Sequence, residues 1–133
     1  MMYEELTRVK HRREDGWLSE LVSMNYPDQP FHCVHTYVVS IAPGKTRAKH
    51  YHRKKEEWAA ITSGKIQLLM EHVETKEKAS VLLDTASPDY KIIYIPPNVA
   101  HALRNPGECD ASLVMFSRMP EDKDDTIPYE MSE

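Results

Sequence analysis

The hydrophobic residues of this chain fall in short runs and at alternate positions, with turn-forming residues between them. The runs are rich in β-branched and aromatic residues, which is typical of β-strands. We expect strands at 15–24, 32–41, 57–63, 65–73, 79–83, 91–95, 101–104 and 111–119, with a short edge strand within 1–14. No segment has convincing helical periodicity. The pattern therefore predicts an all-β sandwich or barrel of about nine to eleven strands.

Composition narrows the class of protein. The 133 residues suit one domain with a substantial core, and no internal repeat divides them, so we expect a single domain over 1–133. A net charge of -4 argues against a nucleic-acid partner. No signal peptide is recognisable and no apolar run approaches about 18 residues, so we expect a cytoplasmic protein without a membrane partner. Cys33 and Cys109 are expected to be buried free thiols.

Candidate chemistry begins in the segment 44–64. His50 and His52 are separated by one residue, so on a strand both imidazoles face the same side. Glu57 follows five positions after His52, next to Glu56. Two imidazoles and a carboxylate are suitable ligands for a divalent transition metal such as Zn, Fe, Mn or Ni.

A second segment, 90–105, offers a further ligand. Pro96 and Pro97 end one strand, and His101 comes at the start of the next. A hairpin here would bring His101 back over the sheet, toward the first three residues. Three imidazoles and one carboxylate would leave open positions on a bound ion, which is characteristic of catalytic rather than structural metal sites.

The two segments resemble the paired motifs of the cupin superfamily. In segment 44–64 the matching residues are Gly44, His50, His52, Glu57 and Gly64. The motif's spacing to its second glycine, here Gly64, favours Glu57 over the adjacent Glu56. In segment 90–105 the matching residues are Pro96, His101 and Asn105. Tyr90 and Asn98 stand where glycines are usual, and asparagine tolerates the same left-handed conformation. The resemblance implies a single-domain cupin, which is a double-stranded β-helix or jelly-roll barrel.

A narrower resemblance, to RmlC-like sugar-nucleotide enzymes, follows from the segments 15–20, 47–51, 95–101 and 124–129. They are similar in order to segments of dTDP-4-dehydrorhamnose 3,5-epimerases. His52 and Glu57 depart from that pattern, where glutamine and lysine are usual. Together with the other ligands they are more similar to the carboxy-terminal cupin domain of capsular-polysaccharide sugar-modifying enzymes. This implies a metal-assisted epimerase or isomerase acting on a nucleotide-linked keto sugar in polysaccharide biosynthesis.

Such a reaction needs a base, and the sequence leaves its identity open. A metal would stabilise the enolate as a Lewis acid. A histidine that gives its lone pair to the metal cannot also accept a proton. If His50 is a ligand, the base must be Glu56, His35, Tyr37 or Tyr129. We take His50, Glu56 and Tyr129 as the catalytic candidates.

Substrate binding and assembly are further expectations. The guanidinium of Arg47 suits a sugar-nucleotide phosphate, and Lys49 is a second candidate. The resemblance implies a homodimer paired through amino-terminal strands, which would cover an exposed edge. Two other functions fit the same residues. One is an iron-dependent cupin dioxygenase, and the other is a sugar- or metal-binding cupin without turnover.

Overall fold

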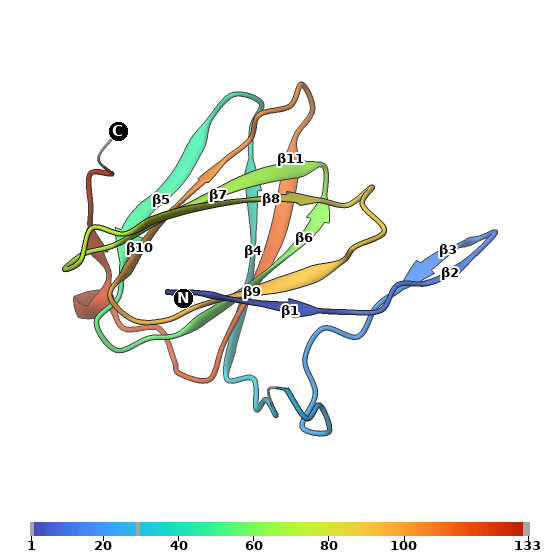
Figure 1. Cartoon of the computed structure of the whole chain (residues 1–133), viewed down its shortest axis with the longest axis horizontal. Coiled ribbons are helices and arrows are strands. Elements are labelled where there is room, and N and C mark those ends of the chain that lie inside the picture. The colour runs from blue at the N-terminus through green and yellow to red at the C-terminus, as the bar shows by residue number, and fades with distance from the viewer. Residues whose placement is uncertain (1, 29, 132–133) are drawn as a thin grey trace.

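The computed structural model describes residues 2–28 and 30–131, which form two five-stranded antiparallel sheets and a separate hairpin (Figure 1). The first sheet has the order β1-β9-β6-β11-β4, the second β12-β5-β10-β7-β8, and the hairpin is β2-β3. The strands are β1 Glu4–Thr7, β2 His11–Arg13, β3 Gly16–Leu18, β4 His35–Ile41, β5 Thr46–Tyr51, β6 Glu57–Ser63, β7 Lys65–His72, β8 Lys78–Asp84, β9 Lys91–Ile95, β10 Val99–Arg104, β11 Ala111–Ser117 and β12 Ile127–Pro128. A short 3-10 helix, η1 (Lys123–Asp125), precedes β12. The predicted all-β architecture is confirmed.

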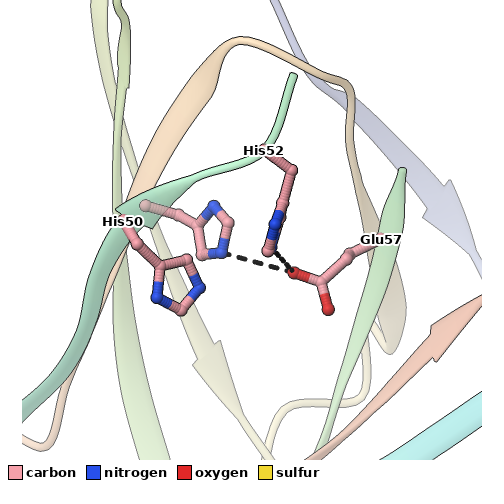
Figure 2. A group of neighbouring side chains, drawn as sticks. His50, His52 and Glu57 are labelled. Atoms are coloured by element: carbon pink, nitrogen blue, oxygen red, sulfur yellow. Dashed lines mark hydrogen bonds and ion pairs between the residues drawn. The ribbon is translucent and has the colours of Figure 1, made fainter. Parts of the chain in front are cut away.

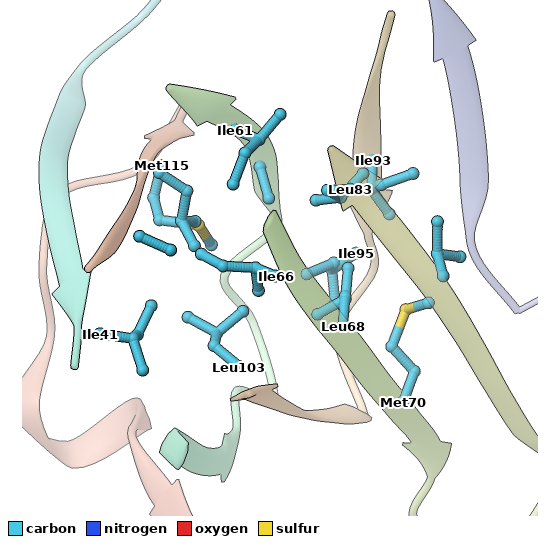
Figure 3. Packing of buried hydrophobic residues seen from close by; sticks show 14 of the residues in the cluster. Ile41, Ile61, Ile66, Leu68, Met70, Leu83, Ile93, Ile95, Leu103 and Met115 are labelled. Carbon is cyan, nitrogen blue, oxygen red and sulfur yellow. The ribbon is translucent and has the colours of Figure 1, made fainter. Parts of the chain in front are cut away.

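The apolar core lies between the two sheets (Figure 3). Strands β7, β8 and β11 alternate buried and exposed positions, so each sends every second side chain inward. Ile66 and Leu68 of β7 meet Ile61 of β6 and Leu103 of β10 in this space. Each such side chain stabilises the fold by about 1.5–3 kcal/mol when it is fully buried. No helix in residues 2–28 and 30–131 is long and apolar enough to cross a membrane.

The amino-terminal third differs from its predicted strands. The predicted strand 15–24 is limited to β3, and β4 begins at His35 rather than at 32. Instead of pairing in a sheet, Leu21 and Val22 pack against a small cluster on the first sheet that contains Phe31 and Trp58. In this cluster the Phe31 and Trp58 ring centroids lie 4.5 Å apart. The connection between β3 and β4 therefore covers the outer face of the first sheet.

Cys33 and Cys109 are free thiols, as predicted, but the prediction that they are buried was wrong, because both are exposed. Cys33 precedes β4 and Cys109 precedes β11, so each belongs to a connection rather than to an inward-facing strand position. Neither thiol contributes to the core.

A β-bulge in β5 lies next to His50 and affects the direction of its side chain. Ala48 and Lys49 have positive φ angles of 72° and 59°. In the register with β10, His101 opposes His50 and Ala102 opposes Ala48, which leaves Lys49 as the extra residue. Ala48 packs against the core and the Lys49 side chain is exposed. The bulge thus lets His50 point inward, opposite His101, at the end of the strand.

Candidate functional site

Four polar side chains meet between the sheets, at one end of the barrel. They are His50, His52, Glu57 and His101, and one ligand atom from each lies within 4.8 Å of all the others. Figure 2 shows the His52 ring directed at the Glu57 carboxylate, with His50 beside it. His52 follows the end of β5, so strand alternation does not place it. The segment between β5 and β6 turns the ring inward. The sequence-predicted ligands are therefore close neighbours.

Hydrogen bonds orient two of the three rings. His52 Nδ1 lies 2.9 Å from the Asp125 carbonyl oxygen, and its Nε2 lies 3.0 Å from Glu57 Oε1. His101 Nδ1 lies 3.2 Å from the Val99 carbonyl oxygen, and its Nε2 lies 3.4 Å from the same Oε1. Because a carbonyl only accepts, Nδ1 carries the proton in each ring. Both Nε2 atoms then face a carboxylate oxygen, which requires either a second proton on each ring or a cation among them.

The spacing of these atoms suits a metal ion. Bonds of about 2.0–2.2 Å from a metal to nitrogen or oxygen place neighbouring ligand atoms about 3–3.5 Å apart. The two Nε2–Oε1 distances of 3.0 and 3.4 Å lie in that range. His50 is the fourth member, with its ring centroid 4.8 Å from that of His101 and 5.0 Å from that of His52. The cluster could therefore hold a divalent ion.

Glu57 is the electrostatic centre of the site. Its side chain is 1% exposed, and Oε2 accepts a hydrogen bond from the Tyr37 hydroxyl at 2.5 Å and lies 3.7 Å from Lys55 Nζ. Burial raises the pKa of Glu57, but the hydrogen bonds from His101, His52 and Tyr37 outweigh it and hold the pKa far below the usual range. Glu57 is therefore a carboxylate. Burial and the nearby Glu57 charge raise the pKa of Tyr37, so its phenol stays protonated.

The histidines differ in their protonation. Burial, together with the positive charges of His101 and His52, lowers the pKa of His50 to about 4. For His52, burial lowers the pKa, but the hydrogen bond and charge of Glu57 prevail and the net shift is upward. His50 is consequently neutral near pH 7, with a lone pair available to a metal or a proton.

A pocket of about 280 Å³ opens beside the cluster. Its lining residues are His35, Tyr37, His50, His52, Lys55, Glu121 and Thr126. Lys55 is a buried cation in this wall, with Nζ 2.8 Å from Glu121 Oε2 and 3.5 Å from His35 Nδ1. The roles of Lys55, Glu121 and Asp125 were missed in the sequence. The basic run 53–55 beside His52 was a signal for Lys55. The acidic tail 120–133 was expected to pack in part across the mouth of the domain, but nothing in it singled out Glu121 or Asp125.

Two of the proposed base residues lie outside this pocket. Glu56 points away from Glu57, since its carboxylate accepts from Tyr94 Oη at 2.5 Å and from Arg118 Nη2 at 2.7 Å. The Tyr129 hydroxyl donates a hydrogen bond to the Glu71 carboxylate, and Glu71 lines another pocket. Of the candidate bases, the structure thus gathers His35 and Tyr37 with His50, and leaves Glu56 and Tyr129 elsewhere.

The two expected phosphate-binding residues also lie outside the histidine pocket. Arg47 Nη1 is 3.4 Å from the carbonyl oxygen of Ser40, between the edges of β5 and β4. Lys49, displaced by the bulge, lines a separate pocket of about 640 Å³ together with Glu71 and Lys78. The histidine pocket draws its positively charged side chain from Lys55 instead.

Comparisons with known proteins place the fold. A dTDP sugar isomerase from Desulfovibrio desulfuricans G20 superposes with a TM-score of 0.87 at 16% identity, covering 97% of this chain and 84% of that one. A sugar 3,4-ketoisomerase from Thermoanaerobacterium thermosaccharolyticum, solved with TDP, gives 0.79 at 19% identity, covering 95% and 87%. An RmlC epimerase from Mycobacterium tuberculosis gives 0.78 at 14% identity, covering 94% and 67%. These likenesses confirm the RmlC-like cupin fold.

Sequence comparison gives a family as well. Residues 11–127 match the model of the family described as "Polysaccharide biosynthesis C-terminal domain". No curated protein matches the chain by sequence. The family match covers most of the chain, including both histidine segments.

Proposed function

The chain belongs to the polysaccharide biosynthesis C-terminal domain family, and we propose that it is an isomerase or epimerase of a nucleotide-linked keto sugar. Two observations support the substrate class. The family name refers to polysaccharide biosynthesis, and structures of the same fold include a dTDP sugar isomerase and a 3,4-ketoisomerase bound to TDP. The geometry of the histidine pocket supports the reaction type.

The observation that carries the proposal is a neutral histidine and a buried ammonium in one pocket. His50 and Lys55 both line the 280 Å³ pocket. Isomerisation beside a ketone begins when a base removes the proton from the adjacent carbon, which leaves an enolate. His50 takes that proton and returns it to a neighbouring position or to the other face of the carbon. Lys55 places positive charge near the oxygen that becomes negative.

We further infer that His52, Glu57 and His101 hold a divalent metal, which leaves His50 free as the base. Two of these rings already direct Nε2 at Glu57 Oε1, whereas within residues 2–28 and 30–131 no hydrogen bond or ion pair joins His50 to that carboxylate. A metal bound there would supply Lewis-acid chemistry to a substrate oxygen. This division resolves the conflict that arises when His50 is assigned both roles.

A solvent-exchange experiment tests the reaction. The metal-loaded protein is incubated in D2O with a TDP-linked 4-keto-6-deoxy sugar, and NMR and mass spectrometry follow deuterium at the carbons beside the ketone. We expect deuterium incorporation and a new keto sugar. Consumption of oxygen with oxidation of the sugar would instead identify a dioxygenase, and binding without exchange would identify a module with no turnover.

The variant His50→Gln separates the two roles of this residue. If His50 is the base, exchange falls by about 10²–10⁴ while the metal content stays at the wild-type level. If the variant also loses its metal, His50 is a fourth ligand and the proton goes to another group, of which His35 is in the pocket.

We also infer a homodimer formed through the amino-terminal strands. The β2-β3 hairpin stands away from the two sheets (Figure 1), and Val9, Trp17 and Leu18 are 65%, 40% and 60% exposed. A two-stranded hairpin is marginally stable alone, and burial of these side chains against a second copy would stabilise it. Light scattering should give twice the chain mass, and Leu18→Asp should shift the protein to monomer. A monomeric wild-type protein at all concentrations would contradict this inference.

A further inference from the structure

The carboxy-terminal residues 121–129 cross the open end of the barrel and contact the histidine site at several points. We propose that Asp125 is a positioning residue of this site, which fixes the ring of His52 and the loop that carries Lys55. Any effect of Asp125 on catalysis rests on the proposed function. Its structural content, the orientation of His52, can be tested independently of any substrate.

The carboxylate of Asp125 binds the backbone of the loop between His52 and Glu57. Oδ1 accepts from the amide of Arg53 at 2.9 Å, and Oδ2 accepts from the amide of Lys55 at 3.0 Å. The amide of Lys54 lies 3.2 Å from both oxygens. Successive amides that converge on one anion form a backbone nest. Asp125 is 6% exposed, so the loop conformation depends on an anion that the chain itself supplies from 70 residues away.

The main chain of the same residue orients His52. Its carbonyl oxygen accepts from His52 Nδ1 at 2.9 Å, which keeps a proton on Nδ1 and leaves Nε2 as the nitrogen that would bind a metal. Hydrogen bonds of this kind set the tautomer of metal-binding histidines, and their loss typically weakens metal binding by about 10- to 100-fold. Asp125 therefore controls both a proposed ligand and the loop that leads to the next one.

Neighbouring contacts attach this segment to the rest of the site. Glu121 pairs with Lys55 at 2.8 Å on one side of Asp125. On the other side, β12 pairs with the end of β5, where Pro128 opposes His50. Asp125 thus lies between these two contacts, and its carboxylate connects the pocket wall to the histidine cluster. A purely local cap would not connect these three parts of the site.

The experiment compares Asp125→Ala and Asp125→Asn with Asp124→Ala, a change at an exposed neighbour in the same 3-10 helix. Each full-length variant is titrated with Zn²⁺, and the His52 ring nitrogens are assigned by ¹H–¹⁵N NMR with and without the metal. Asp125→Ala keeps the carbonyl that accepts from His52, but it removes the carboxylate that holds this carbonyl and the 53–55 loop in place. We therefore expect this variant to weaken Zn²⁺ binding by about 10- to 100-fold, and the metal-bound His52 ring to lose its single Nδ1–H tautomer. Asparagine keeps one acceptor oxygen, so Asp125→Asn should show a smaller loss, and Asp124→Ala should behave as wild type.

Thermal melting identifies a role that is only structural. If Asp125→Ala or Asp125→Asn lowers the melting temperature but leaves the His52 tautomer and the Zn²⁺ affinity unchanged, the proposal is wrong. If Asp125→Ala does not fold, the folded Asp125→Asn variant decides by the same two readouts. If the wild-type protein turns over no keto sugar, the proposed function fails, yet the His52 spectrum still tests the role of Asp125. With an active protein, the variants should reduce kcat more than they raise KM.

Discussion

The two ends of the barrel interior are built from the same strands and are held together in different ways. Strand β6 carries Glu57 at the polar end and Ile61 in the apolar end, and β10 carries His101 and Leu103 in the same manner. The apolar end is closed by side-chain packing within the two sheets (Figure 3). The polar end is completed by residues outside them, namely the loop after His52 and the carboxy-terminal segment.

This difference has an energetic consequence. Burial of apolar side chains stabilises the fold directly, whereas buried charges are costly unless each is paired. Glu57 meets that requirement with donors or cations on both oxygens. The apolar end should therefore determine the stability of the protein, and the polar end its affinity for a cation. Changes placed at one end or the other test this separation.

The largest effect is expected in the core. Leu68→Ala removes a fully buried side chain and leaves a cavity, so the free energy of unfolding should fall by about 2–5 kcal/mol. Urea denaturation measures this change. The Zn²⁺ affinity of the folded fraction should stay unchanged, because Leu68 is not part of the histidine cluster. Leu82→Ala is the matched control, since this side chain is 55% exposed and its loss should change stability by less than about 0.5 kcal/mol. Equal losses in both variants would contradict the assignment of the core.

At the polar end, Glu57→Gln should act mainly on metal binding. Glutamine keeps the shape but removes the negative charge that faces two Nε2 atoms. We expect Zn²⁺ affinity to fall by about 100-fold, or about 2.8 kcal/mol at about 1.4 kcal/mol per factor of ten. Isothermal titration with metal gives the value. Wild-type affinity in this variant would refute the ligand role of Glu57.

The sequence predicted the four gathered side chains because the spacing within each segment is short. His50, His52 and Glu57 are separated by a few residues, and the Pro96–Pro97 turn indicated a hairpin that returns His101 to them. Spacing to Gly64 also distinguished Glu57 from its neighbour Glu56. Alternating apolar positions predicted most strands from β6 onward, where local pattern and pairing agree.

The missed features depend on contacts between distant parts of the chain. Asp125 reaches the loop after His52 only because β12 pairs with the end of β5, and a two-residue strand leaves no pattern in the sequence. The bulge at Ala48 and Lys49 has no glycine to indicate it, and Lys49 lines a separate pocket rather than the histidine pocket. The predicted strand 15–24 gives way to tertiary packing of Leu21 against the outer cluster.

A smaller effect is expected from Tyr129→Phe, whose hydroxyl contacts Glu71 in the wall of the 640 Å³ pocket. The variant loses a hydrogen bond to the buried carboxylate of Glu71, and bonds to charged groups contribute about 1.5–3 kcal/mol. Stability to urea should fall by an amount near the lower value, because Lys76 and Tyr51 still contact the ring. Deuterium exchange into the keto sugar should match that of wild type. A loss of exchange without a loss of stability would restore Tyr129 as a catalytic candidate.

The smallest effect is expected from Glu56→Gln, which pairs with Glu57→Gln as a test of two adjacent carboxylates, one just before β6 and one at its first residue. Glu56 lies on the outer face, where it contacts Arg118 and the Tyr94 hydroxyl. Partly exposed ion pairs contribute about 0.2–1 kcal/mol, so the variant should lose no more than that in stability. Its Zn²⁺ affinity and its rate of deuterium exchange should stay within about twofold of wild type, because Glu56 does not line the histidine pocket. If Glu56→Gln abolished exchange while Glu57→Gln kept its metal, the adjacent carboxylates would have the opposite roles, and the polar end would have to be rebuilt around Glu56.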